Sequence, residues 1–393
     1  MSPHPARCTS HTILILTGEA SGDMYGAMLA NALKQRDPRL VLSGVGGNAM
    51  AGAGVDLLAH INTLSVMGLT EIIGKLPVIW RTRNTLKKAL AQTPPDLVIL
   101  IDFPEFNLEI ARLARQRNIP VLYYISPKIW AWRQGRVNTI RRRVNHMAVI
   151  FPFEAAFYRK HKVPVSFVGH PLLDRIALPF RDDRMNRLPD GPVIGLLPGS
   201  REKEVSSLLG PLLEAAGQIQ AEISSARFIV SRADSIDADR FFRTISPWQT
   251  ALNMEIVTGP VSQIFSQCHL VVAASGTVTL EAALWGIPTV IVYKVSPLSY
   301  RLGKHLIKVK HIGLANLIAG KALSPELIQD DASPENIAQT VLSLIGHPDR
   351  LTDMQNSLLR TRSFLGESGA SDRVARIALS LMREVAPENR TIA

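Results

Sequence analysis

The chain has little cysteine and a modest share of charged residues, and both shortages exclude classes of protein. Only two of its 393 residues are cysteines, Cys8 and Cys268, so the sequence indicates neither a disulfide framework nor a thiolate metal site. We expect both thiols to be reduced. Charged residues make up 20% of the chain and hydrophobic residues 46%, which excludes a largely disordered protein.

Long apolar runs are also missing. The longest apolar stretch, residues 270–293, is interrupted by Ser275, Glu281 and Pro288, so it predicts strand, turn, helix and strand rather than a membrane span. The first residues, MSPHPARCTSH, are polar, and the apolar run at 13–16 is far shorter than a secretory core segment. We therefore expect a cytoplasmic protein without an integral membrane segment.

The charge of the chain is strongly basic. A formal net charge of +11 favours polyanionic partners, which are nucleic acid, anionic lipid or phosphorylated small molecules. Neither zinc-finger spacing nor an aromatic RNA-binding signature is present, so we expect no nucleic-acid partner. The sequence also lacks metal-ligand clusters and a GxSxG nucleophile elbow, which argues against a metal site and a triad hydrolase.

The length of the chain predicts two domains, because 393 residues are too many for one ordinary core. The order of its apolar segments predicts an α/β protein. Short apolar runs alternate with helical patterns, as is typical of βαβ units and buried parallel sheets. The runs lie at 13–16, 97–101, 121–125, 193–197, 228–230, 255–257, 270–273 and 289–292. We expect a doubly wound, Rossmann-like domain over 1–180, a linker over 181–192, a second such domain over 193–365, and a C-terminal helix over 366–393 that can pack back on the first domain.

Ligands of open parallel sheets bind beyond the carboxyl ends of strands, where helix N-termini offer free amides. Residues 13–23 (ILILTGEASGD) have this layout of strand, loop and helix. The glycine spacing departs from the dinucleotide fingerprint, so a nicotinamide cofactor is not indicated. We predict a phosphate-binding loop here, and the alternative is a tight strand-to-helix turn. The candidate residues are Gly18, Glu19, Ser21, Gly22 and Asp23.

Residues 193–205 (VIGLLPGSREKEV) repeat the layout. Gly199 and Ser200 form the turn, and Arg201 follows at the strand's exit. A guanidinium there can pair with a diphosphate through two parallel hydrogen bonds. The alternative is a surface arginine paired with Glu204.

Residues 270–293 contain the third such loop. Ser275, Gly276 and Thr277 lie where a helix is predicted to begin, so their amides and hydroxyls can hold phosphate oxygens. Glu281 lies one turn later on the same helix face, where a ribose would present its hydroxyls. A carboxylate on an otherwise apolar helix is costly without a partner, which favours a binding role for Glu281. Gly286 is predicted to end the helix.

In a fourth segment, residues 97–107 (LVILIDFPEFN), Asp102 directly follows a predicted buried strand. A carboxylate at the end of such a strand can take a proton from an attacking hydroxyl. The alternative is a helix-capping aspartate, and Glu105 is the competing base.

Residues 66–88 combine apolar and aromatic groups with cations. Such a segment favours binding to a membrane surface, with cations on lipid phosphates and apolar groups in the headgroup boundary. The alternative is a core-facing helix with a solvated basic flank. The residues predicted to face the membrane are Ile72, Ile73, Leu76, Ile79, Trp80, Arg81 and Arg83.

Together these segments resemble the lipid-A-disaccharide synthase family of inverting GT-B glycosyltransferases. The resemblance runs from about residue 13 to residue 329, through GEASGD, IDFPEFN, YYISPKIWAWRQGRV, FPFE, VGHP, LPGSR, SGTVTLE and NLIAG. It implies two Rossmann-like domains that face a central cleft. It also implies transfer of a diacylated glucosamine from UDP to the 6-hydroxyl of diacylglucosamine 1-phosphate, with no metal or other cofactor.

The resemblance implies roles for single residues. Asp102 becomes the general base, and the loop at 18–23 lies on the acceptor side. The residues implied to hold the UDP donor are Gly199, Ser200, Arg201, Ser275, Gly276, Thr277, Glu281, Asn316 and Gln329. With the basic segment at 66–88, we expect peripheral association with the anionic cytoplasmic face of the inner membrane; a homodimer stays open.

Two positions depart from the family's usual pattern. Glu105 stands where an aspartate is commoner, and Lys128 stands where a small residue is commoner. The roles of both positions stay open, while the expected reaction class is unaffected.

Three other functions stay open. A UDP-sugar 2-epimerase would use the same UDP-binding residues but would not need a lipid-facing segment. A related transferase acting on a cell-wall lipid intermediate would differ in its acceptor. A basic membrane-binding or nucleotide-sensing module would lack catalysis.

Overall fold

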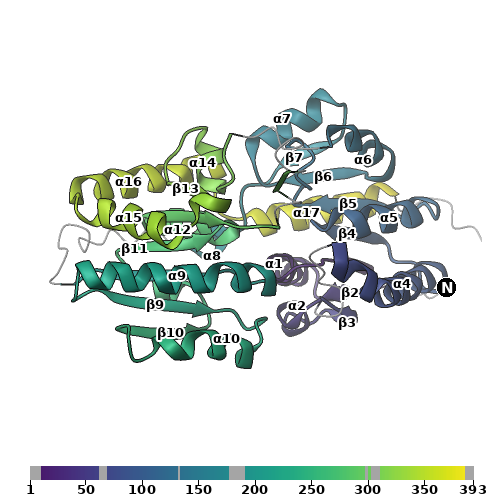
Figure 1. Cartoon of the computed structure of the whole chain (residues 1–393). Helices are drawn as coiled ribbons and strands as arrows, with labels where there is room; N and C mark the ends of the chain where they lie inside the picture. The colour runs from purple at the N-terminus through teal and green to yellow at the C-terminus, as the bar shows by residue number, and fades with distance from the viewer. Residues whose placement is uncertain are drawn as a thin grey trace, which may run out of the picture. The chain divides into compact units, whose positions relative to one another are not determined.

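The structure is a computed structural model, and it describes residues 10–61, 69–131, 133–176, 191–296, 300–301 and 310–385, with only the backbone at 69–76 and 385. Cys8 and residues 181–190 of the expected linker lie outside these ranges. The chain divides into two compact units (Figure 1). The first comprises Met1–Arg175 together with Leu365–Ala393, and the second comprises Ile176–Phe364.

The described part of the first unit contains a parallel sheet with the strand order β3-β2-β1-β4-β5-β6-β7. Its strands are β1 (Thr12–Leu16), β2 (Val41–Gly46), β3 (Asp56–His60), β4 (Leu97–Ile101), β5 (Val121–Tyr124), β6 (His146–Val149) and β7 (Val165–Phe167). Its helices are α1 (Ala20–Arg36), α2 (Asn48–Gly52), α4 (Leu69–Gln92), α5 (Pro104–Arg115), η1 (Gln134–Arg136), α6 (Val137–Arg143), α7 (Pro152–Lys160), α8 (Leu172–Arg175) and α17 (Ala370–Val385).

The described part of the second unit contains a parallel sheet with the order β10-β9-β8-β11-β12-β13. Its strands are β8 (Val193–Leu197), β9 (Arg227–Arg232), β10 (Met254–Thr258), β11 (Leu270–Ala274), β12 (Thr289–Tyr293) and β13 (Glu326–Ile328). Its helices are α9 (Glu202–Glu222), α10 (Ala238–Ile245), η3 (Ser246–Trp248), α11 (Ser262–Phe265), α12 (Thr277–Trp285), α14 (Leu314–Ala319), η4 (Gln329–Asp331), α15 (Pro334–Ile345) and α16 (Pro348–Arg360), and η5 (Thr361–Leu365) leads out of it.

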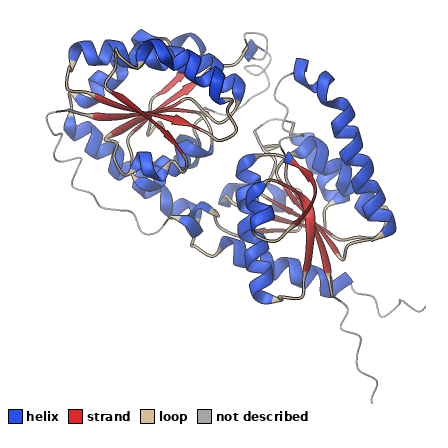
Figure 2. Ribbon diagram, turned by 90° about the horizontal axis from the view of Figure 1, so that it is seen from below, coloured by secondary structure: helices blue, strands red, loops and turns tan. Residues whose placement is uncertain are grey.

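Helices cover both faces of each sheet, as Figure 2 shows. This burial explains why the central strands are continuous apolar runs, and every residue of β4 and β11 is buried. Each sheet has the strand order of a doubly wound fold. The chain stops adding strands on one side of the sheet and starts on the other side between β1 and β4 in the first unit, and between β8 and β11 in the second. The predicted doubly wound α/β class is therefore confirmed for both units.

The first unit is built from two distant parts of the chain. Helix α17 packs against α1 (Figure 1). The Arg36 guanidinium pairs with the Asp372 carboxylate at 2.6 Å. The Asp174 carboxylate accepts the backbone amides of Ala370 and Ser371 at 3.2 and 3.1 Å, which satisfies free donors at the start of α17. The last helix is thus tied to both the beginning and the end of the first segment.

Helix α5 begins earlier than its apolar pattern indicates. The apolar residues at helical spacing begin near residue 108, whereas α5 starts at Pro104. Proline fits the first helical turn because its φ is already helical and its missing amide would have no partner there. Glu105 consequently lies in the first turn of α5 rather than in a loop.

A membrane-spanning helix is not found: among the residues that the structure describes, none of the helices has both the length and the apolar character to cross a bilayer.

Candidate functional site

Two loops meet at the carboxyl edge of the first sheet. One follows β1 and the other follows β4, and these strands are neighbours. A Cβ atom placed on Gly18 would lie 2.3 Å from Cγ of Phe103, so only glycine allows the Phe103 ring to lie this close to the loop. The structure therefore brings the predicted phosphate loop beside Asp102, at the point where doubly wound sheets bind ligands.

Asp102 lies in a left-handed turn. Its φ is 44° and that of Phe103 is 47°, a conformation that costs a non-glycine residue about 1–2 kcal/mol. The carbonyl of Asp102 accepts hydrogen bonds from the Tyr123 hydroxyl at 2.6 Å and from Nδ2 of Asn107 at 2.7 Å. Phe103, not Asp102, occupies the N-cap position of α5. Strained backbone of this kind is typical of functional positions.

The predicted competing base, Glu105, lies on the surface. Its side chain is 67% exposed, and its carboxylate pairs with Arg136 at 2.6 Å and with Arg133 at 3.2 Å. Because two guanidiniums pair with its oxygens, Glu105 is not favoured as a base. Lys128, the other unusual position, is exposed.

Asp23 is engaged within the fold. Its carboxylate accepts the amides of Gly47 at 2.6 Å, Ala49 at 3.0 Å and Met50 at 3.0 Å, and it thereby satisfies the start of α2. The residue is 7% exposed, so its predicted contact with a ligand is not supported by this geometry. Of the other candidates in the loop, Glu19 and Ser21 are half-buried, and Gly18 and Gly22 are buried.

Glu154 is a buried acid that sequence reasoning did not single out, although it lies in the FPFE segment. Its carboxyl group accepts hydrogen bonds from Nε1 of Trp130 at 3.1 Å and from the amide of Phe151 at 3.2 Å. Burial raises the pKa of Glu154 to about 8, which favours the neutral form of the group. The contact joins the SPKIWAW segment to the start of α7.

The loops that follow β8 and β11 lie at the carboxyl edge of the second sheet and carry most of the predicted donor residues. Helix α12 begins at Thr277, after the two-residue turn that follows β11. Gly286 caps its C-terminus, and the φ of 69° at Gly286 is the left-handed conformation of a helix stop. Both predicted limits of this helix are confirmed. The Ser275 hydroxyl donates to the carbonyl of Ile312 at 3.2 Å, and Glu281 is half-buried in the second turn.

Arg201 lies at the exit of β8, the strand beside β11. Its guanidinium pairs with the Glu204 carboxylate at 2.9 Å, which is the alternative that the sequence left open. The Arg201 side chain is 37% exposed, and a surface pair of this kind contributes about 1 kcal/mol or less, so a diphosphate could displace the carboxylate. Gly199 has a φ of 118°, and a Cβ atom there would lie 2.5 Å from Glu204 Oε2.

Tyr293 lies near this ion pair and was not predicted from the sequence. Burial raises the pKa of the Tyr293 hydroxyl, the negative charge of Glu204 raises it further, and the positive charge of Arg201 opposes the shift. Tyr293 is the last residue of β12, so the exits of β8, β11 and β12 all lead to the same edge.

Asn316 and Gln329 are used by the fold itself. Nδ2 of Asn316 donates to the Ser324 carbonyl and to Glu326, and its Oδ1 accepts the amides of Leu323 and Ser324, all between 2.7 and 2.9 Å. Gln329 accepts the Val295 amide at 2.7 Å and donates to the Val295 carbonyl at 2.9 Å. The filled hydrogen-bonding positions of Asn316 do not favour its predicted direct contact with the donor, and Gln329 instead fixes the segment that follows β12.

The predicted membrane segment is divided by the structure. Ile79 packs against the hydrophobic core of the first unit, whereas the Trp80 side chain is 63% exposed. Arg81 is exposed, and Arg83 pairs with Glu109 at 3.1 Å. The side chains of Ile72, Ile73 and Leu76 lie outside the described part of the chain.

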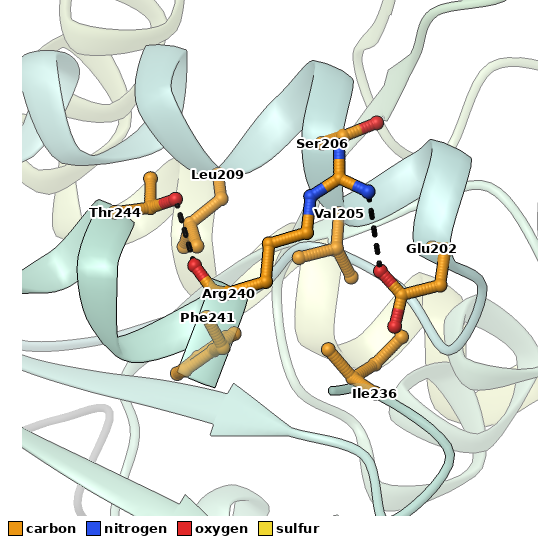
Figure 3. Close-up of a pocket in the computed structure, with 8 residues that line it drawn as sticks. All are labelled: Glu202, Val205, Ser206, Leu209, Ile236, Arg240, Phe241 and Thr244. Carbon is orange, nitrogen blue, oxygen red and sulfur yellow. Dashed lines mark hydrogen bonds and ion pairs between the residues drawn. The ribbon is translucent and has the colours of Figure 1, made fainter. Parts of the chain in front are cut away.

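A small pocket lies beside the Arg201 loop, between α9 and α10 (Figure 3). Glu202 and Arg240 approach each other to 3.9 Å at this pocket, and Val205 and Phe241 line its apolar part. Its volume is about 110 Å³, below the roughly 300–1,000 Å³ typical of small-molecule sites. We therefore do not identify it with a nucleotide site.

Comparison with known proteins covers nearly the whole chain. The family model described as lipid-A-disaccharide synthetase matches residues 13–379. The lipid-A-disaccharide synthase of Geobacter sulfurreducens is 44% identical over 381 residues, which cover 95% of this chain and 98% of that protein. That of Syntrophus aciditrophicus is 44% identical over 383 residues, which cover 95% and 99%.

Two solved structures are similar in fold. The UDP-GlcNAc 2-epimerase of Neisseria meningitidis, bound to UDP-GlcNAc, has a TM-score of 0.63 and 13% identity, with 94% of this chain and all of that chain covered. The calicheamicin glycosyltransferase CalG4 has a TM-score of 0.59 and 17% identity, with 96% and 100% covered. The structural similarity shows a fold of the GT-B type. At identities this low it says nothing about the reaction.

Proposed function

We propose, from the premise that this chain belongs to the lipid-A-disaccharide synthase family, that it transfers 2,3-diacylglucosamine from its UDP-activated form to 2,3-diacylglucosamine 1-phosphate. The products are the β-1,6-linked disaccharide 1-phosphate and UDP. One observation carries the proposal: the family match spans both units and includes the loops that follow β1, β4, β8 and β11. The 2-epimerase alternative is not favoured, because the 44%-identical relatives are synthases while the epimerases share only the fold.

The acceptor chemistry is assigned to Asp102. The 6-hydroxyl oxygen of the acceptor forms a bond to the anomeric carbon of the donor, and the bond from that carbon to the diphosphate oxygen breaks with its electron pair. The hydroxyl proton passes to the Asp102 carboxylate, which acts as general base. Displacement from the opposite side inverts the anomeric centre.

The donor chemistry is assigned to the carboxyl edge of the second sheet. Negative charge grows on the departing diphosphate, and fixed positive groups aimed at that charge lower the barrier. The Arg201 guanidinium and the amides at the start of α12 provide such groups. Glu281, one turn further along α12, is assigned to the ribose hydroxyls, while Asn316 and Gln329 support the neighbouring loops.

Release of UDP should depend on the lipid acceptor. We expect UDP to form from UDP-diacylglucosamine only when diacylglucosamine 1-phosphate is added, because the acceptor hydroxyl is the nucleophile. An acceptor that lacks the 6-hydroxyl should give no UDP. A coupled UDP assay measures both results; a change of the donor in the absence of acceptor would instead indicate an epimerase.

We also propose that the chain works at the surface of the inner membrane, where its acylated substrates partition. Trp80 and Arg81 project from α4, an aromatic group next to a cation, as interfacial segments require.

Replacing Trp80 with serine should lower the partition coefficient for vesicles of phosphatidylglycerol and phosphatidylethanolamine, measured by pelleting, by about tenfold or more. Burying one large apolar side chain contributes about 1.5–3 kcal/mol. Phe242→Ser is the matched control, because Phe242 is an exposed aromatic residue of the second unit. Equal pelleting of the Trp80 variant and the native chain would contradict this assignment.

A further inference from the structure

The backbone turn that carries Asp102 is held by neighbouring side chains, and its importance for catalysis rests on the proposed function. Asp102 and Phe103 are consecutive non-glycine residues in the left-handed region, so the turn needs outside contacts to hold it. The Asp102 amide donates to the Tyr124 carbonyl at 3.3 Å, which ties the start of the turn to β5. The carbonyl of Asp102, on the other side of the residue, is bonded by side chains.

Two buried donors converge on that carbonyl. The Tyr123 hydroxyl lies 2.6 Å from the Asp102 oxygen, and Nδ2 of Asn107 lies 2.7 Å from it. Nδ2 of Asn107 also donates to the Ile101 carbonyl at 3.2 Å, and the Asn107 amide donates to the Phe103 carbonyl at 3.0 Å. Tyr123 and Asn107 are both fully buried, so both donors are shielded from water, while Asp102, which carries the acceptor, is half-buried.

The Tyr123 hydroxyl is a permanent donor. Burial raises the pKa of Tyr123 well above its usual range, and the negative charge of Asp102 raises it further. The hydroxyl therefore keeps its proton throughout the pH range in which the enzyme can be assayed. Its ring belongs to β5, the strand beside β4, so its position is set by the sheet itself.

We propose that Tyr123 and Asn107 are positioning residues that hold the Asp102 peptide in its left-handed turn and so fix the direction of the catalytic carboxylate. Neither residue is assigned a contact with a substrate. Their contribution is preorganisation, because a base held within hydrogen-bond reach of the acceptor hydroxyl need not be ordered during the reaction.

Tyr123→Phe removes one hydroxyl and keeps the buried ring. We expect kcat to fall about tenfold, the equivalent of one neutral hydrogen bond, while KM for both substrates and the Kd for UDP stay within twofold. Tyr124→Phe is the matched control: Tyr124 is the next residue of β5 and equally buried, and its hydroxyl does not bond to Asp102 in the described structure. The control should keep its native kcat.

A merely structural role is separated by a double-mutant cycle. If Tyr123 acts through Asp102, Tyr123→Phe should lower kcat about tenfold in the native background and less than twofold in Asp102→Asn. Asn107→Leu, which removes the second donor, should follow the same pattern. Native kcat in Tyr123→Phe, or an equal loss in both backgrounds, would overturn the inference. Undiminished turnover of Asp102→Asn alone would instead remove the proposed base.

Discussion

Replacing Asp102 with asparagine is expected to lower kcat by about 10²–10⁴-fold, the usual contribution of a general base. The amide keeps the shape of the side chain but does not accept the proton of the acceptor hydroxyl. The Kd for UDP should change by less than about twofold, because the nucleotide is assigned to the second unit and Asp102 lies in the first. Steady-state UDP release gives kcat, and titration calorimetry gives the Kd.

Glu105→Gln is the matched control for Asp102. Glu105 lies three residues further along the chain, is exposed, and is already paired with Arg133 and Arg136. We expect its loss to change kcat by no more than a few-fold. The reverse outcome, in which Glu105→Gln is inactive and Asp102→Asn is active, would assign the base to residue 105.

Arg201→Ala should affect both UDP binding and turnover. Loss of one fixed donor to a developing negative charge costs about 10²–10³ in rate, and we expect kcat/KM for the UDP donor to fall by this factor. The Kd for UDP should rise, because the diphosphate of the product makes the same contact. Arg201→Lys should recover part of this loss, since lysine retains the charge but not the two-pronged geometry.

Arg240→Ala provides the comparison for Arg201. Arg240 also belongs to the second unit and lies near a glutamate at the start of α9, Glu202, but its side chain is 59% exposed and it lies at the small pocket of Figure 3. Its loss should leave kcat/KM and the Kd for UDP nearly unchanged. If calorimetry gave the same Kd for UDP in the native and Arg201→Ala proteins, the assignment of Arg201 to the UDP-binding site would be wrong.

The central strands could be predicted because burial on both faces makes them continuous apolar runs, as in β4 and β11. Strand β2 was missed because its sequence, VLSGVG, contains Gly44 and Gly46, which weaken a strand pattern. The structure explains Gly44: a Cβ atom there would lie 1.9 Å from the Ile15 carbonyl oxygen. A requirement that arises from a neighbouring strand leaves no periodic signal in the local sequence.

In the candidate site, too, residues with a local sequence signal could be predicted and residues that depend on distant contacts could not. Loop positions such as Arg201 and Ser275 could be predicted, because strand, glycine-rich turn and helix start follow one another along the chain. The use of Asp23 by α2 could not, because its partners lie 24–27 residues away. Tyr123 was missed for a similar reason, since its contact with Asp102 depends on the pairing of β5 with β4.

The capping of α17 by Asp174 has a consequence for biosynthesis. Val374, Ala375 and Ala378 of this helix are fully buried in the first unit, so that unit lacks part of its interior until residue 378 has left the ribosome. The second unit, encoded between the two segments, has no such dependence and can fold earlier. The half of the enzyme that is translated first is therefore expected to mature last, with its unfinished surface exposed to chaperones in the meantime.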